Sequence, residues 1–431
     1  MKRLITEFNV TPNSEMVQTD LIQKAIDECA KENVVLEFVP GTYNTGTLFL
    51  RTNTSINLLE DAVISGSDNM EDYPDNEASF VDAVNQKRGK ALIIAYRAED
   101  IKITGEGKIF GNGTVLLEST RPFLVRIVES KNVKIQGVSL CDAAAWCLHI
   151  NGSSNVLVDG ITIDSRVNAN NDGIDIDASN HITIKNSHIM SGDDGICLKA
   201  TMDCPCEYIN VENCKVLSGW AGFKIGTESV GDIRHISVKN CYFYDVVGGG
   251  IKIVPTDGAN VEDVIIENIE MSNCTGPIFI ALGERLREYA GVGRKTLSTI
   301  KDVKIVNVKA DVVSAPIRGE YLGEIWGNAI GGIIISGTKL NFIKNLTLKN
   351  IEAALPGGVT DYVEHEVIYI ADKYPEFHMM DTVPAKGLYL RNIENSEVSD
   401  FKLSFKAEDV RKLYHIEDCN DLKVENINEV H

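Results

Sequence analysis

The sequence lacks the features that define several other protein classes. No apolar run approaches the ~18 residues of a membrane-spanning helix, and residues 1–15 contain no apolar core of a secretory signal. Ten cysteines among 431 residues are too few for a disulfide scaffold, so we expect free thiols. The 42 basic residues are outnumbered by 62 acidic ones, and the net charge of −20 disfavours a nucleic-acid partner. These absences predict a soluble, cytoplasmic protein that binds neither nucleic acid nor membrane.

The sequence does contain a short phrase that recurs along most of the chain. Copies of it are NVKIQG at 132–137, HITIKN at 181–186, HISVKN at 235–240 and NLTLKN at 345–350. Each copy alternates apolar and polar residues and is rich in β-branched types, which is typical of a β-strand. The copies end at 137, 160, 186, 213, 240 and 268, then more widely at 307, 350 and 400. A repeat of this period indicates a solenoid.

The repeat predicts an all-β chain that folds as a single-stranded right-handed parallel β-helix. Two or three short strands fit into each coil, and Asn, Asp or Gly closes each phrase because these residues tolerate a left-handed backbone. A β-sandwich is the alternative, but its strands would recur every 8–12 residues without a long-range register. Apolar residues at 17, 21, 22, 25, 26 and 29 mark one helical face. We therefore predict a capping α-helix over 16–31 that covers the first open edge, within one domain spanning 1–431.

The three widest spacings predict long loops inserted within residues 270–400. These loops contain Arg285–Tyr289, Tyr321–Trp326 and Tyr362–Met380. Loops on one face of a solenoid often form a binding wall, although variable surface is the alternative interpretation.

Two neighbouring coils carry a concentration of carboxylates. Asp172 lies in NNDGIDID (170–177), and Asp193 and Asp194 lie in SGDDGICLK (191–199), close to one coil later. Three acids within one coil repel one another, which proteins tolerate chiefly for metal binding or proton transfer. Glycoside hydrolysis uses such a set, with one acid for the leaving oxygen and another for the attacking water. Calcium is the rival interpretation; because the acids are divided between two turns, we predict catalysis and no metal or other cofactor.

Alternation predicts which side chains leave the core next to these acids. Ile174 and Ile176 point inward, so Asp175 and Asp177 point outward. By the same rule three lysines face outward on three successive coils: Lys199, Lys224 and Lys252. In an acidic protein, such cations suggest a substrate that carries a carboxylate. Pairing of the lysines with Asp175 and Asp177 is the alternative.

Two tryptophans and a histidine complete the candidate site. Trp220 and Trp146 fall near the acids in this register, and each could stack on a sugar or simply pack. His149 is predicted either at the edge of the cleft or buried in the core.

Several motifs resemble those of glycoside hydrolase family 28, the polygalacturonase family of pectin-cleaving β-helices. They are LIQKAIDECAKENV near the N-terminus, GEGKIFGNG at 105–113 and RPFLVRIVESKNVKIQGVSL at 121–140. Asn170-Asn171-Asp172 matches the family's N-x-D, and Gly192-Asp193-Asp194 matches its G/Q-D-D. The resemblance implies an inverting hydrolase in which Asp193 is the general acid and Asp172 with Asp194 holds and deprotonates water. Inversion leads us to expect acid and base roughly 6.5–9.5 Å apart.

The chain departs from the family at two positions. The family's G-H-G is here Trp220-Ala221-Gly222, and its R-I-K is Gly250-Ile251-Lys252, so a histidine and an arginine that normally position substrate are replaced. We expect Lys224 and Lys199 to compensate, and Tyr289 to meet a family tyrosine position.

The sequence thus predicts an inverting glycoside hydrolase that acts on pectin-derived, uronate-containing oligosaccharides of galacturonan or rhamnogalacturonan type. Exo action is expected because intact pectin cannot enter a cell. A β-helical uronate lyase or epimerase remains one alternative, and a non-catalytic carbohydrate-binding β-helix remains another.

Overall fold

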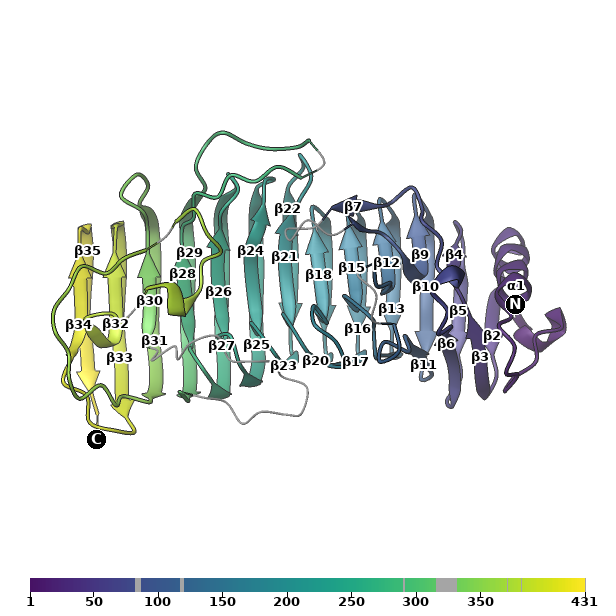
Figure 1. Cartoon of the computed structure of the whole chain (residues 1–431), viewed down its shortest axis with the longest axis horizontal. Helices are drawn as coiled ribbons and strands as arrows, with labels where there is room; N and C mark the ends of the chain where they lie inside the picture. Colours follow the sequence, from purple (N-terminus) through teal and green to yellow (C-terminus); the bar gives the residue numbers. More distant parts are fainter. Residues whose placement is uncertain are drawn as a thin grey trace. The chain divides into compact units, whose positions relative to one another are not determined.

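The computed structural model describes residues 1–81, 87–116, 120–289, 291–314, 332–369, 371–380 and 382–430. Strands make up 54% of it and helices 6%. The chain divides into two compact units, Met1–Asp194 and Gly195–His431. Within each unit, strands pair in parallel with their counterparts one coil earlier and one coil later (Figure 1), which confirms the predicted right-handed parallel β-helix.

Three parallel ladders account for most described strands of the first unit. The first ladder contains β1 (Lys2–Leu4), β2 (Val35–Phe38), β5 (Ser55–Leu58), β10 (Glu99–Gly105), β13 (Lys131–Gln136), β16 (Ser154–Asp159) and β19 (Asn180–Lys185). The second contains β3 (Gly41–Thr45), β6 (Ala62–Gly66), β11 (Lys108–Phe110), β14 (Ser139–Cys141), β17 (Thr162–Ser165) and β20 (His188–Ser191). The third contains β4 (Leu48–Leu50), β9 (Ala91–Tyr96), β12 (Phe123–Val128), β15 (Leu148–Asn151) and β18 (Ile174–Asp177). Two further strands, β7 (Phe80–Val81) and β8 (Lys87–Arg88), pair antiparallel with each other.

Longer strands build the second unit. One ladder contains β22 (Cys206–Glu212) and β23 (Lys215–Ser218), then β25 (Ile233–Val246), β27 (Asn260–Cys274), β29 (Thr299–Val312), β31 (Ile343–Leu355), β33 (Ile393–Phe405) and β35 (Asn420–Glu429). The other contains β21 (Ile196–Ala200), β24 (Phe223–Ser229), β26 (Ile251–Pro255), β28 (Ile278–Ala281), β30 (Ile333–Ser336), β32 (Ala385–Arg391) and β34 (Lys412–Glu417).

Stacked apolar side chains form the interior of the coils. In the first unit Ile103 pairs with Ile135, which pairs with Val158, which pairs with Ile184, and all four are buried. Burial of each such side chain contributes roughly 1.5–3 kcal/mol. The apolar positions of the recurring phrase therefore hold the solenoid together.

Asparagines close the phrases as predicted. Asn240, Asn268, Asn307 and Asn350 all adopt a left-handed backbone, with φ between 54° and 58°. The side-chain amides of Asn268, Asn307 and Asn350 each donate to the amide oxygen of the preceding asparagine in this series, at 3.0, 3.0 and 2.8 Å. The turns of successive coils are thus linked by a ladder of hydrogen bonds.

The N-terminal cap is an α-helix, α1 (Thr19–Glu32), preceded by a short 3-10 helix, η1 (Ile5–Phe8). It starts three residues later than predicted. Ile22, Ala25, Ile26 and Cys29 are buried, but the predicted face was too wide, because Leu21 is 38% exposed. The helix packs beside the first strands of its unit (Figure 1).

The described part of the longest inserted loop covers one face of the second unit. The loop of the second unit contains a 3-10 helix, η3 (Phe377–Met380). The remaining 3-10 helix of the described residues, η2 (Met70–Asp72), belongs to the first unit. Phe377 and Met380 pack on Val254, Phe279 and Tyr389 of β26, β28 and β32. The predicted loop segment Tyr321–Trp326 lies outside the described residues.

None of the helices within the described residues is long and apolar enough to cross a membrane.

Candidate active site

Three aspartates of the first unit come together as predicted. Asp172 lies two residues before β18, and Asp193 and Asp194 follow β20. One carboxylate oxygen of each lies within 4.8 Å of the others. Asp172 and Asp194 are buried, whereas Asp193 is only partly buried. The cluster therefore has one acid that is more open to solvent than the other two.

Asn171 fixes the backbone that carries this cluster. The Asn171 side chain is buried, and its amide nitrogen donates to the carbonyls of Ala143 and Ala145 at 2.9 and 2.8 Å. Its amide oxygen accepts from the backbone N–H groups of Val167 and Asn168. The Asn171 carbonyl accepts from the N–H groups of Gly192 and Asp193 at 3.1 and 3.2 Å. One residue thus ties both acid-bearing turns together, since Asp172 follows it directly.

The spacing of the acids leaves room for a water. One oxygen of each acid lies within 4.8 Å of one oxygen of the others, whereas the 6.5–9.5 Å expected between acid and base refers to whole carboxyl groups. A water that accepts or donates hydrogen bonds of roughly 2.7–2.8 Å to two carboxylates spans such a gap. The close approach of these oxygens therefore fits two acids that share one water.

The same oxygens would also suit a cation. Three carboxylates within 4.8 Å form a possible metal-ligand set, and no other group of three His, Cys, Asp or Glu side chains among the described residues is arranged in this way. Calcium prefers six to eight oxygen ligands, so the three aspartates alone would leave its coordination incomplete.

His149 lies in a buried network of the first unit. Its Nδ1 accepts from Arg126 Nε at 3.3 Å, and its Nε2 lies 3.6 Å from an Asp177 oxygen. The ring packs on Phe123 and Trp146, with centroids 5.5 and 5.2 Å away. Burial lowers the pKa of Arg126 to about 9. The structure thus favours the buried alternative for His149 and the packing alternative for Trp146.

The outward-facing lysines of the second unit are not an exposed cation patch, which corrects the predicted accessibility. Lys199, Lys224 and Lys252 are at most 5% exposed. The alternation of apolar and polar residues along each strand predicted that these lysines point away from the core. It could not show that other segments of the chain cover the outer face on which they lie. Asp175 of the first unit is likewise buried rather than open to solvent.

Lys252 is paired within its own unit. Its Nζ donates to Oε2 of Glu376, and Oε1 of Glu376 accepts from Trp220 Nε1 at 3.0 Å. The ammonium also lies 5.1 Å from the Trp220 ring centroid. Trp220 therefore holds a carboxylate of the chain.

The other two lysines also have partners in the second unit. Lys199 Nζ lies 2.8 Å from a carboxylate oxygen of Glu228, which is itself buried. Lys224 Nζ donates to the hydroxyl of Tyr374 at 2.5 Å. Intramolecular pairing was the predicted alternative for these lysines, and the partners described within the second unit are Glu228, Tyr374 and Glu376. Pairing with Asp175 and Asp177 stays a prediction.

Tyr289 is buried in an ion-pair network of the second unit. Its hydroxyl donates to Asp257 at 2.9 Å and accepts from Arg285 at 2.8 Å. Burial raises the pKa of Tyr289. A sugar contact of Tyr289 stays a prediction.

Comparison with known proteins identifies the family. The family model described as glycosyl hydrolases family 28 matches residues 58–354. This chain belongs to glycoside hydrolase family 28. It is a glycoside hydrolase.

Relatives and solved structures agree with this assignment. A probable polygalacturonase of Vitis vinifera is 23% identical over 92% of this chain and 86% of its own length. An exo-poly-alpha-D-galacturonosidase of Dickeya chrysanthemi is 26% identical over 80% of this chain and 68% of its own. In fold, the chain resembles a family 28 exopolygalacturonase of Yersinia enterocolitica, with a TM-score of 0.77, 17% identity, and 99% and 79% coverage.

The family motifs located the acids but not the residues that cover the lysines. Ala221, at the family's histidine position, is fully buried. Glu376 and Tyr374 lie in the longest insertion, where the repeat provides no register, and Glu228 lies at the end of β24 beyond the recurring phrase. We find no sequence signal that would have paired them with the lysines.

Proposed function

We propose that this family 28 hydrolase cleaves pectin-derived, uronate-containing oligosaccharides of galacturonan or rhamnogalacturonan type, with inversion and by exo action. The observation that supports this most is the close group of Asp172, Asp193 and Asp194, which occupies both acid motifs of the family. The Vitis, Dickeya and Yersinia proteins named above support a galacturonan substrate, and the latter two are named as exo-acting.

Each acid has a role that fits its burial. Asp193, the most accessible of the three, is the general acid that gives its proton to the leaving glycosidic oxygen. Asp172 and Asp194 hold the attacking water between them and take its proton as the new bond forms at the anomeric carbon. Repulsion among the three carboxylates favours retention of one proton in the cluster, which an acid catalyst needs.

The test is incubation with galacturonan and rhamnogalacturonan oligosaccharides of defined length, with analysis of products by mass. Exo hydrolysis releases one saturated unit at a time from a chain end, and random fragment lengths would contradict it. A lyase would instead give an unsaturated product that absorbs ultraviolet light. A purely binding protein would release no reducing ends.

A further inference from the structure

The carboxylate of Glu376 occupies a complete anion site in the second unit. An ammonium and an indole N–H each donate to one of its oxygens, from Lys252 and Trp220. Both partners are the kinds that proteins use to grip a carboxylate, since charge-assisted hydrogen bonds are strong and an ammonium is stabilised by a nearby aromatic ring. Lys252 is fully buried and Glu376 is 5% exposed. In this structure the site is filled by the chain itself.

The segment around Glu376 is held by its own packing. The neighbouring Phe377 packs on Phe279 with ring centroids 4.6 Å apart. Two glycines make room for this ring, because a Cβ on Gly249 or Gly276 would come within 2.8 or 2.5 Å of it. The position of Glu376 therefore does not depend on the ion pair alone, and the carboxylate is a fixed part of the site.

We propose that Glu376 is a specificity-determining residue that substitutes for a substrate carboxylate at Lys252 and Trp220, so that the sugar unit bound next to them is neutral. A uronate at this point would bring a second carboxylate to a cation that is already neutralised, at the cost of desolvation and like-charge repulsion. This inference rests on the proposed function, and on the prediction from the sequence that Lys252 and Trp220 contact the substrate. It assigns the uronate recognition of the enzyme to other parts of the chain.

The experiment compares binding of D-galacturonate and D-galactose to full-length wild type, Glu376→Ala and Glu376→Gln by calorimetry. Alanine removes both charge and volume, so we expect about a tenfold or greater gain in affinity for galacturonate and none for galactose. Glutamine removes the charge but keeps the volume, and we expect no gain. The double variant Glu376→Ala/Lys252→Met, which lacks the cation, should lose the gain.

Two outcomes would overturn the inference: a folded Glu376→Ala protein that binds galacturonate no better than wild type, or an equal gain in the double variant. If Glu376→Ala is unstable, addition of propionate should raise its melting temperature, because the carboxylate replaces that of the lost side chain. Propionamide, which carries no charge, should not raise it. An equal rise with both compounds would count against the proposal. These readouts do not require turnover. Failure of wild type to cleave any pectic oligosaccharide would instead refute the proposed function.

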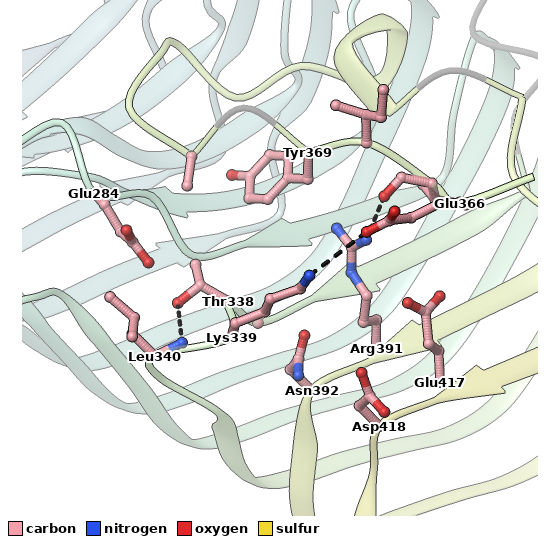
Figure 2. A pocket seen from close by; sticks show the side chains of 14 residues that line it. Glu284, Thr338, Lys339, Leu340, Glu366, Tyr369, Arg391, Asn392, Glu417 and Asp418 are labelled. Atoms are coloured by element: carbon pink, nitrogen blue, oxygen red, sulfur yellow. Dashed lines mark hydrogen bonds and ion pairs between the residues drawn. The ribbon is translucent and has the colours of Figure 1, made fainter.

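A separate cavity in the second unit carries an independent inference. Its volume is about 370 Å³, and Figure 2 shows the side chains that line it. Arg391 and Asn392, at the end of β32, line it and are only 8% and 3% exposed. The Asn392 side chain lines the cavity, and its backbone N–H donates to the Glu417 carbonyl at 3.1 Å. Polar groups that line a cavity of this kind fix the orientation of a ligand, so Arg391 and Asn392 indicate a binding site.

The charges around this cavity select the chemical class of that ligand. Arg391 donates to two neutral oxygens, Ser336 Oγ at 3.1 Å and the Val367 carbonyl at 2.8 Å, and it forms no ion pair within the described ranges. A buried guanidinium disfavours a cationic ligand. Four carboxylates also line the cavity and disfavour an anionic one: Glu284, Glu366, Glu417 and Asp418. One of them, Glu366, lies 3.5 Å from Lys339 Nζ, so the other three carry the uncompensated negative charge.

We infer that the cavity binds one or two neutral sugar rings. Hydroxyl groups can donate to the carboxylates and accept from Arg391 and Asn392, and the volume is within the range of small-ligand sites. Calorimetry with methyl galactoside, xylose and galacturonate tests this in wild type and Asn392→Gly, because glycine tolerates the left-handed φ of 51° at this position.

The matched control is Asn350→Gly, which makes the same change at an exposed residue with φ 54° that does not line the cavity. We expect at least one neutral sugar to bind at this site, a loss of about tenfold or more in affinity for Asn392→Gly, and no loss for the control. The inference would be overturned if Asn392→Gly bound the neutral sugars as well as wild type does, or if wild type bound none of them. It would also be overturned if wild type bound galacturonate more tightly than the neutral sugars and Asn392→Gly lost that binding.

Discussion

The buried pair of Lys252 and Glu376 makes a quantitative prediction about stability. The Lys252 side chain is fully buried and that of Glu376 is 7% exposed, so water screens the pair very little. Replacing Lys252 by methionine keeps most of the side-chain volume and leaves the Glu376 carboxylate without this cation. We expect the free energy of unfolding to fall by about 3–5 kcal/mol, the usual cost when one partner of a buried ion pair is removed.

The double variant Lys252→Met/Glu376→Gln should recover most of that loss, because no uncompensated charge remains. Lys24 and Glu28 provide a matched control on α1, with side chains 67% and 43% exposed. Removing Lys24 should cost about 0.5 kcal/mol at most.

The assay is urea-induced unfolding of the four proteins, with hydrogen exchange in β26 as a local readout because coils of a solenoid can open separately. A loss below about 1 kcal/mol for Lys252→Met, or a double variant as unstable as the single one, would refute the reasoning that the pair is buried and mutually dependent.

Further predictions concern the acids and a thiol. Asp193→Asn should lower kcat about 10²–10⁴-fold with an unchanged melting temperature, and near-normal turnover would reject its role as general acid. A chelator should leave activity unchanged, since no metal is proposed; loss of activity restored by calcium would favour the rival interpretation of the cluster. Asn171→Ala should cost about 2–4 kcal/mol, because buried backbone groups lose their partners, and a stable variant in chemical denaturation would count against its role in fixing the turns. Burial raises the pKa of Cys274 from 9.0 to about 12. Because the thiol of the unfolded chain loses its proton first, the contribution of Cys274 to the free energy of unfolding falls as pH rises from about 9 to 12. In unfolding experiments across this pH range, Cys274→Ala should therefore lose less stability than wild type.

Much of the fold could be predicted because it repeats. The asparagines that close the phrases and the inward-facing residues such as Ile135 and Val158 follow directly from the local pattern. The carboxylate cluster was predictable for the same reason, since residues one coil apart lie side by side in a β-helix.

The burial of the outward face could not be predicted, because it depends on contacts between distant segments. Glu376 reaches Lys252 across 124 residues of sequence, from an insertion without periodicity. Alternation states only that Lys252 points away from the core, and it says nothing about what covers it. The distances between the acids could not be predicted for a related reason, since the repeat register identifies neighbouring coils but gives no distances between carboxylate oxygens.

The most direct test of the central claim is the anomeric form of the first product, followed by NMR during cleavage of a galacturonan oligosaccharide by wild type and Asp193→Asn. The account predicts a saturated sugar of inverted configuration from wild type and almost no product from the variant. A product of retained configuration, an unsaturated product, or equal turnover by the variant would contradict it.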